Sequence, residues 1–114
     1  MTTALVVGAG IAGLATALCL SRIGIPTTIL ERRTGFTETG AGLQLSPNAS
    51  RVLVDLGLGP ALRRAACEPP AVVVRNARSG RRVGGVALGA FMRERFGAPY
   101  LVIHRVDLQT ILLD

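Results

Sequence analysis

The chain opens on an uncharged stretch, residues 2–21, in which glycines interrupt an apolar run. Residues 4–7 have the length and character of a buried strand, and the apolar positions that begin near residue 11 favour a helix. Gly24 is predicted to end that helix as a left-handed glycine. A second apolar run follows at residues 27–30. Strand, helix and strand in this order predict a β-α-β unit whose parallel strands are covered on both faces.

Further along the chain the apolar runs become shorter. A polar loop is predicted over 32–40 and a short extended segment over 43–45. Ser46 and Pro47 predict an N-cap and a first helical position, and Gly57 ends the helix that follows. The other predicted elements are a helix over 60–66, hairpin strands over 71–75 and 82–87, helical turns over 88–96, a strand over 100–104 and a helix that includes Asp107 in its first turn.

Three glycines give the opening unit a candidate chemistry. Gly8, Gly10 and Gly13 have the G-x-G-x-x-G spacing, which allows a tight turn, a close approach of backbone to phosphate, and close packing of helix on strand. The free N–H groups of the first helical turn favour an anion. Glu31 ends the second strand 18 positions after Gly13, where an acid accepts the ribose hydroxyls of an adenosine. The pattern predicts an ADP-binding β-α-β unit.

Two other interpretations of this stretch remain open. Its length suits a membrane span or the apolar part of a signal peptide. However, no basic residue precedes it, and clustered glycines suit a turn better than a lipid-facing helix. A glycine turn without a ligand is the second alternative. We expect no membrane partner.

Composition limits the size and the type of core of the domain but indicates no catalytic group. The 114 residues amount to one domain or less, and 49% hydrophobic with 4% aromatic content predicts an aliphatic core. Cys19 and Cys67 lack metal-site spacing, and Cys19 is expected to lie buried in its apolar helix. His104 is the only histidine, so no multi-histidine zinc site and no metal are expected. Unpaired cysteines fit a reducing cytoplasm.

The net charge of +6 comes from 13 arginines and no lysine. Such a balance first suggests nucleic acid. The arginines are scattered from Arg22 to Arg105, however, and no aromatic residues alternate with them. We therefore expect a solvated arginine surface and no nucleic-acid partner.

Three stretches taken together resemble a known family. They are residues 8–13 through Glu31-Arg32-Arg33, residues 40–49 (GAGLQLSPNA), and the sequence His104-Arg105-Val-Asp-Leu108. In this order they resemble the FAD-dependent aromatic-ring monooxygenases of the salicylate and hydroxybenzoate hydroxylase type. The resemblance spans nearly the whole chain. It implies an α/β fold in which a Rossmann-like β-α-β FAD-binding unit carries an added β-hairpin, as an incomplete FAD/NAD(P)-binding domain.

The resemblance also implies roles for individual residues. Gly8, Gly10 and Gly13 would hold the FAD pyrophosphate, and Glu31 the adenosine ribose. Further cofactor contacts are implied for Arg32 or Arg33 beside the adenosine, for Gly40, Ala41 and Gly42 near the ribityl and isoalloxazine groups, and for Arg105 near the phosphate and ribityl groups. Gln44 is a weaker candidate beside the flavin. His104 is expected to be a strand-end residue, and no catalytic residue is assigned.

The implied activity uses NAD(P)H and O2 to hydroxylate a small phenol-like substrate. Family members also carry a second FAD motif with a Gly-Asp pair and a substrate domain, which residues 1–114 lack. We therefore expect the N-terminal part of an FAD-binding domain, truncated and inactive without its C-terminal portion. The alternatives are another flavin oxidoreductase (epoxidase, halogenase or reductase), an NAD-dependent dehydrogenase, or a non-catalytic or partner-dependent fragment.

Overall fold

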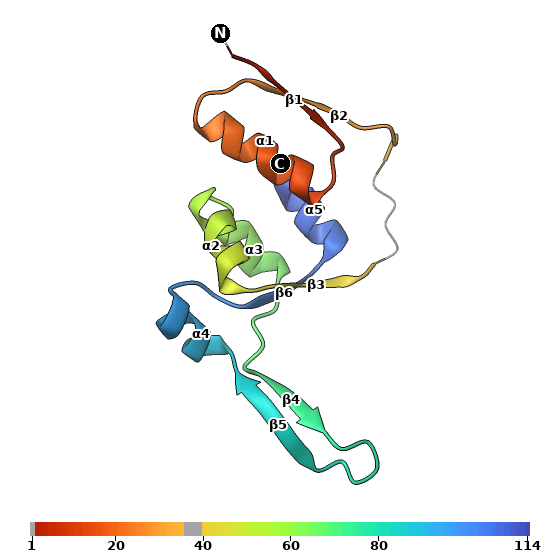
Figure 1. Ribbon diagram of the computed structural model, residues 1–114, viewed down its shortest axis with the longest axis vertical. Helices are drawn as coiled ribbons and strands as arrows, with labels where there is room; N and C mark the ends of the chain where they lie inside the picture. Colours follow the sequence, from red (N-terminus) through yellow and green to blue (C-terminus); the bar gives the residue numbers. More distant parts are fainter. Residues whose placement is uncertain (1, 36–39) are drawn as a thin grey trace.

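The computed structural model describes residues 2–35 and 40–114, an elongated molecule of 61 × 32 × 21 Å (Figure 1). Of the polar loop predicted over 32–40, residues 36–39 lie outside the described residues. The strands are β1 (Ala4–Val7), β2 (Thr27–Leu30), β3 (Gly42–Leu45), β4 (Ala71–Arg75), β5 (Arg82–Ala87) and β6 (Leu101–His104). The helices are α1 (Ile11–Arg22), α2 (Pro47–Asp55), α3 (Gly59–Ala65), α4 (Gly89–Phe96) and α5 (Arg105–Leu113). The predicted element order is confirmed.

The opening β-α-β unit forms as predicted. β1 and β2 pair in parallel with Ala4 opposite Thr27, and the Gly8 N–H continues the ladder to the Leu30 carbonyl at 2.7 Å. Gly24 has φ +79°, and its N–H donates to the Ser21 carbonyl. This left-handed turn satisfies a helix-end carbonyl and lets the chain reverse into β2.

A second group of elements lies beside this unit. β3 and β6 pair antiparallel, with Gly42 opposite His104. Ser46 is the N-cap of α2 with Pro47 at its first position, as predicted, although the Ser46 hydroxyl bonds to the Asn48 side chain instead of a backbone N–H. The antiparallel pair replaces the continued strand–helix alternation that a dehydrogenase domain would show.

The core is aliphatic, as the composition predicts. It forms where α1 and α5 contact each other and where α2, α3 and the β3–β6 pair close around them. Leu62 and Leu108 are only 1% exposed. The other buried apolar members are Ala9, Leu14, Leu45, Leu53, Leu101, Ile103, Ile111 and Leu112. Because Ala9 belongs to this cluster, the glycine loop is packed against the core.

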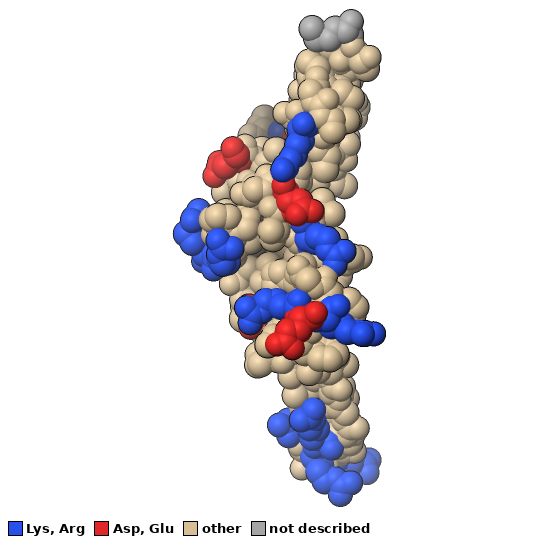
Figure 2. Space-filling model, turned by 90° about the vertical axis from the view of Figure 1, so that its left-hand side faces the viewer, with Lys and Arg blue, Asp and Glu red and all other residues tan. Residues whose placement is uncertain are grey.

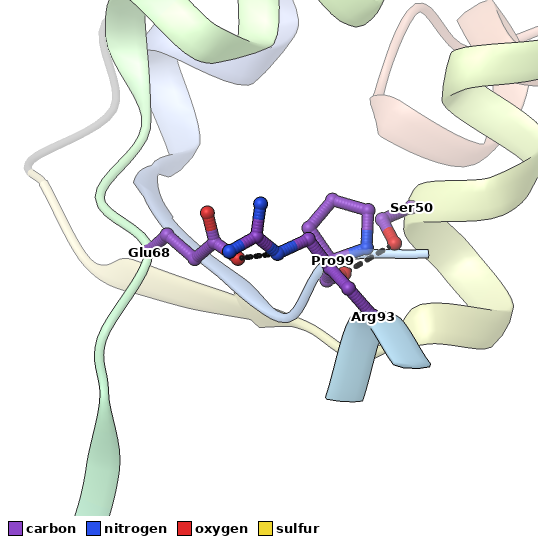
Figure 3. Close-up of polar contacts among 4 residues, drawn as sticks. All are labelled: Ser50, Glu68, Arg93 and Pro99. Carbon is purple, nitrogen blue, oxygen red and sulfur yellow. Dashed lines mark hydrogen bonds and ion pairs between the residues drawn. The ribbon is translucent and has the colours of Figure 1, made fainter. Parts of the chain in front are cut away.

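The hairpin β4–β5 projects away from these elements (Figure 1). Its strands pair antiparallel, and the Leu88 N–H to Pro70 carbonyl bond closes its base at 2.9 Å. Two polar contacts hold the segments that flank the hairpin: one joins these segments to each other, and one joins them to α2 (Figure 3). Arg93 Nε lies 2.9 Å from Glu68 Oε1, and the buried Ser50 hydroxyl donates to the Pro99 carbonyl at 2.5 Å. The hairpin is thus anchored at its base only.

Two expectations about burial are wrong. The β1–β2 pair is not covered on both faces by the described residues: α1 packs on one face, while Leu5 and Val7 on the other are 62% and 81% exposed. Cys19 is exposed instead of buried, because it lies on a side of α1 that borders an open groove with Val52 and Asp55. In both places the apolar pattern is correct, but the covering layer is lacking.

Candidate functional site

The glycine loop connects β1 to α1, and its three glycines have different structural reasons. Gly8 has φ +103°, a left-handed conformation that disfavours any side chain. Gly13 lies one turn into α1, where a Cβ would stand 2.0 Å from the Gly8 carbonyl oxygen. Gly10 is the N-cap of α1, with φ −71° and ψ 179°. The first N–H groups of α1 have no partner within the helix and form the positive end of its dipole.

Glu31 lies directly beside this loop. Its Oε2 accepts the Ala9 N–H at 2.8 Å, and its Oε1 accepts the Arg33 N–H at 3.0 Å. These two backbone donors, first Arg33 and then Ala9, hold the pKa of the Glu31 carboxyl below its usual range. The carboxylate therefore stays ionised at neutral pH. A carboxylate can accept about four hydrogen bonds, so Glu31 keeps acceptor capacity for a further donor such as a ribose hydroxyl.

Arg32 and Arg33 are both exposed and follow β2 directly. The Arg33 guanidinium contributes a smaller electrostatic lowering of the pKa of Glu31. The two arginines bring two positive charges to the segment that follows β2, and the adjacent Glu31 contacts the loop before α1. This electrostatic environment is suited to an anion.

The second and third predicted stretches meet at the start of α5. The Arg105 N–H donates to the Ala41 carbonyl at 3.0 Å. A Cβ on Gly40 would lie 3.5 Å from the His104 ring, and Gly42 pairs with His104 across the sheet. Residues 40–42 and 104–105, more than 60 positions apart, thus form one continuous surface. Arg105 is half-buried at the first position of α5, and His104 is a strand-end residue as expected.

Gln44 lies exposed on β3, and among the described residues its side chain makes no hydrogen bond with the glycine loop. Another glutamine does so instead. Gln109 on α5 is 5% exposed, and its Nε2 donates to the Ala9 carbonyl at 3.0 Å. The sequence signal for Gln109 was weak: it is a polar residue beside the apolar Leu108, on a helix that also carries other polar residues.

One glycine tests whether a dinucleotide fits. The conformation of Gly10 is open to any residue, and no atom lies within 4 Å of the position its Cβ would occupy. Neither backbone strain nor packing among the described residues requires glycine there. A ligand that approaches the backbone at a helix N-terminus does require it. The loop fits the pyrophosphate of a dinucleotide.

Comparison with known proteins agrees with this geometry. A family described as "FAD binding domain" matches residues 1–112. The chain belongs to this FAD-binding family. It is 47% identical to 3-amino-4-hydroxybenzoate 2-monooxygenase PtnB3 of Streptomyces platensis over 96% of this chain and 28% of that protein. It is 44% identical to 3-hydroxybenzoate 6-hydroxylase of Polaromonas naphthalenivorans, again over 96% of this chain and 28% of that protein.

A solved structure has a closely similar fold. Klebsiella pneumoniae HpxO, in complex with FAD and uric acid, superposes with a TM-score of 0.88 at 29% identity, over 99% of this chain and 28% of that one. The chain therefore spans between a quarter and a third of the length of these relatives. The sequence-based assignment to the aromatic hydroxylase type is confirmed at the level of the family.

Residues 2–35 and 40–114 also bear on metal binding and on membrane insertion. No cluster of three or more histidine, cysteine or acidic side chains there could hold a metal ion. Nor does any helix in these ranges combine the length and the apolar character that crossing a bilayer needs.

Proposed function

We propose that this chain forms the ADP-binding part of the FAD site in a flavoprotein monooxygenase. The observation that carries the proposal is Gly10, which leaves open space at the N-terminus of α1, where a ligand can approach the backbone N–H groups. Membership of the FAD-binding family supports the identity of that ligand.

The proposed contacts follow the geometry of the loop. The N–H groups at the start of α1 bind the pyrophosphate. Gly8, Gly10 and Gly13 allow the turn and the close approach of the phosphate to the backbone. Glu31 accepts the ribose hydroxyls with lone pairs that its backbone contacts leave free. The remaining proposed cofactor contacts are Arg32 and Arg33 beside the adenosine, and Gly40, Ala41, Gly42 and Arg105 toward the ribityl and flavin groups.

We propose further that residues 1–114 are the N-terminal part of a longer FAD-binding domain, active only with its C-terminal portion. Two hydroxybenzoate-type monooxygenases support this proposal, because the chain matches only 28% of the length of each. When bound, the flavin supplies electron transfer from NAD(P)H and the reaction with O2 that hydroxylates a small aromatic substrate. The free thiols of Cys19 and Cys67 support a cytoplasmic location.

Reading the coding frame past Asp114 tests the domain proposal. A Gly-Asp flavin motif followed by a further domain is expected. In that longer protein, 3-hydroxybenzoate should stimulate NADH or NADPH oxidation, whereas the 114-residue chain alone should show none. A reading frame with neither feature would contradict the proposal.

Flavin anisotropy with the purified chain tests the cofactor site directly. FAD should bind and ADP should displace it, whereas FMN, which lacks the adenosine, should compete poorly. Gly10→Ala should weaken FAD affinity by about tenfold or more, since a Cβ blocks the backbone approach. Thermal stability should be retained, because the position is open.

Gly84→Ala is the matched control. Gly84 on β5 also has open space at its Cβ position, but it lies on the hairpin. FAD affinity should be unchanged in this variant. Equal affinity of both variants would remove the observation on which the proposal depends.

A further inference from the structure

A buried glutamine holds the glycine loop from the opposite end of the sequence. Gln109 lies on α5 at 5% exposure, next to the core residue Leu108. Its Nε2 donates to the Ala9 carbonyl at 3.0 Å. The orientation of the side-chain amide follows from its partner, because a carbonyl only accepts and the nitrogen must face it.

The Gln109 amide is only half satisfied. Its Oε1 is buried and has no hydrogen-bond partner among residues 2–35 and 40–114. A buried acceptor without a partner is a cost to stability that an apolar side chain of the same shape would avoid. Methionine or leucine at this position would remove the unsatisfied Oε1 but would leave the Ala9 carbonyl without its Gln109 donor. The reason for a glutamine here therefore lies in the group to which its Nε2 donates.

The peptide that Gln109 holds provides that reason. The Ala9 carbonyl and the Gly10 N–H belong to one peptide, and in a trans peptide the two groups point in opposite directions. No cis peptide is found among the described residues. Because Gln109 draws the Ala9 carbonyl toward α5, the Gly10 N–H must point away from α5, to the open side of the loop.

The preceding peptide is held in the same way. The Ala9 N–H donates to Glu31 Oε2 at 2.8 Å, and so the Gly8 carbonyl is turned toward Gly13, where a Cβ would stand 2.0 Å from it. Gln109 thus orients the peptide between Ala9 and Gly10, and Glu31 orients the peptide between Gly8 and Ala9. Ala9 itself is 5% exposed and leaves the loop little freedom to turn.

We propose that Gln109 is a positioning residue for the cofactor. Through the Ala9 carbonyl it directs the Gly10 N–H toward the pyrophosphate of FAD, and it does so at the expense of an unsatisfied Oε1. This inference rests on the proposed function, because the ligand it serves is the one proposed there.

The test compares Gln109→Met with the unmodified chain. Methionine keeps the length of the side chain but removes both polar atoms. Amide hydrogen exchange followed by NMR should show faster exchange at Ala9, whose N–H bond to Glu31 depends on an ordered loop, and FAD affinity should fall about tenfold. The melting temperature should change little, because the variant removes the unsatisfied Oε1 and also removes the donor to the Ala9 carbonyl, two effects of opposite sign. Thr110→Val, at the neighbouring exposed position of α5, should leave exchange and affinity unchanged.

The possible failures are distinguishable. If the unmodified chain does not bind FAD, the proposed function is wrong, while the exchange data still decide whether Gln109 orders the loop. Unchanged exchange in Gln109→Met overturns the inference, as does unchanged affinity beside a binding wild type. Should that variant not fold, the unmodified chain decides: a missing NOE between the Gln109 side-chain amide and Ala9 or Gly10 overturns the inference.

Discussion

Strands β1 and β4 have nearly the same sequence and very different surroundings. β1 reads Ala-Leu-Val-Val, and β4 begins Ala-Val-Val-Val. Residues of β1 alternate between half-buried and exposed because α1 packs on one face. Every residue of β4 is exposed, since β5 alone pairs with it and no described element covers either face. A similar apolar run thus supports the cofactor loop in one place and an uncovered hairpin in the other.

Charge separates the two regions as well. Residues 69–93 contain no acidic residue, and four arginines lie exposed near the tip of the hairpin: Arg75, Arg78, Arg81 and Arg82. Figure 2 shows these blue side chains gathered at the free end of the molecule. At the other end Glu31 lies between backbone donors. The exposed valines show that no described element packs on the hairpin. The glycine loop differs, because Ala9 is packed in the core.

The two regions should differ most in the free energy of unfolding that is lost when a core leucine or a hairpin valine is truncated to alanine. Leu108 is 1% exposed, so Leu108→Ala should lower the free energy of unfolding by about 3–4 kcal/mol. Val74 is 52% exposed, and Val74→Ala should lower it by less than about 1 kcal/mol. Urea denaturation followed by circular dichroism measures both. Similar losses would mean that the hairpin packs against something in solution.

A smaller difference in unfolding free energy is expected between alanine substitutions at two glycines, one in each region. In Gly13→Ala the new Cβ meets the Gly8 carbonyl, and the backbone must shift, at about 2–3 kcal/mol of unfolding free energy. Gly84→Ala meets open space on the hairpin and should change stability by no more than about 0.5 kcal/mol. The same denaturation experiment applies. A stable Gly13→Ala chain would show that helix and strand can separate without cost.

The smallest expected effect is on thermal stability at acidic pH. The pKa of Glu31 is lowered in the folded chain, so its contribution to stability is present above its ordinary pKa and is lost as the pH falls through the lowered value. Thermal unfolding between pH 7 and pH 3 should therefore show a weaker decline for Glu31→Gln than for the unmodified chain, below about pH 4. Amide signals of β4 should not respond, because the hairpin carries no carboxylate.

Glu94→Gln, on α4, is the control for charge. It removes one exposed carboxylate without touching the glycine loop and should retain the decline of the unmodified chain. Identical pH profiles for Glu31→Gln and the unmodified chain would mean that the two backbone donors of Glu31 do not persist in solution.

Much of the fold and part of the site were predictable because their causes are local. Gly24 and Gly57 end helices through left-handed turns, which depend on a few neighbouring residues. The glycine spacing with Glu31 marked the loop for the same reason. Gln109 was missed since its partner is 100 positions away, and no local pattern encodes that contact.

By itself the sequence determined the order of the elements, the β-α-β unit and the class of ligand that its glycine loop suits. Tertiary structure decided which apolar strands are covered, that Cys19 is exposed, and that residues 40–42 meet Arg105. It also decided that α5 holds Ala9. The physical reason is range: backbone conformation and capping act over a few residues, whereas burial and the pairing of polar groups depend on segments brought together only when the chain has folded.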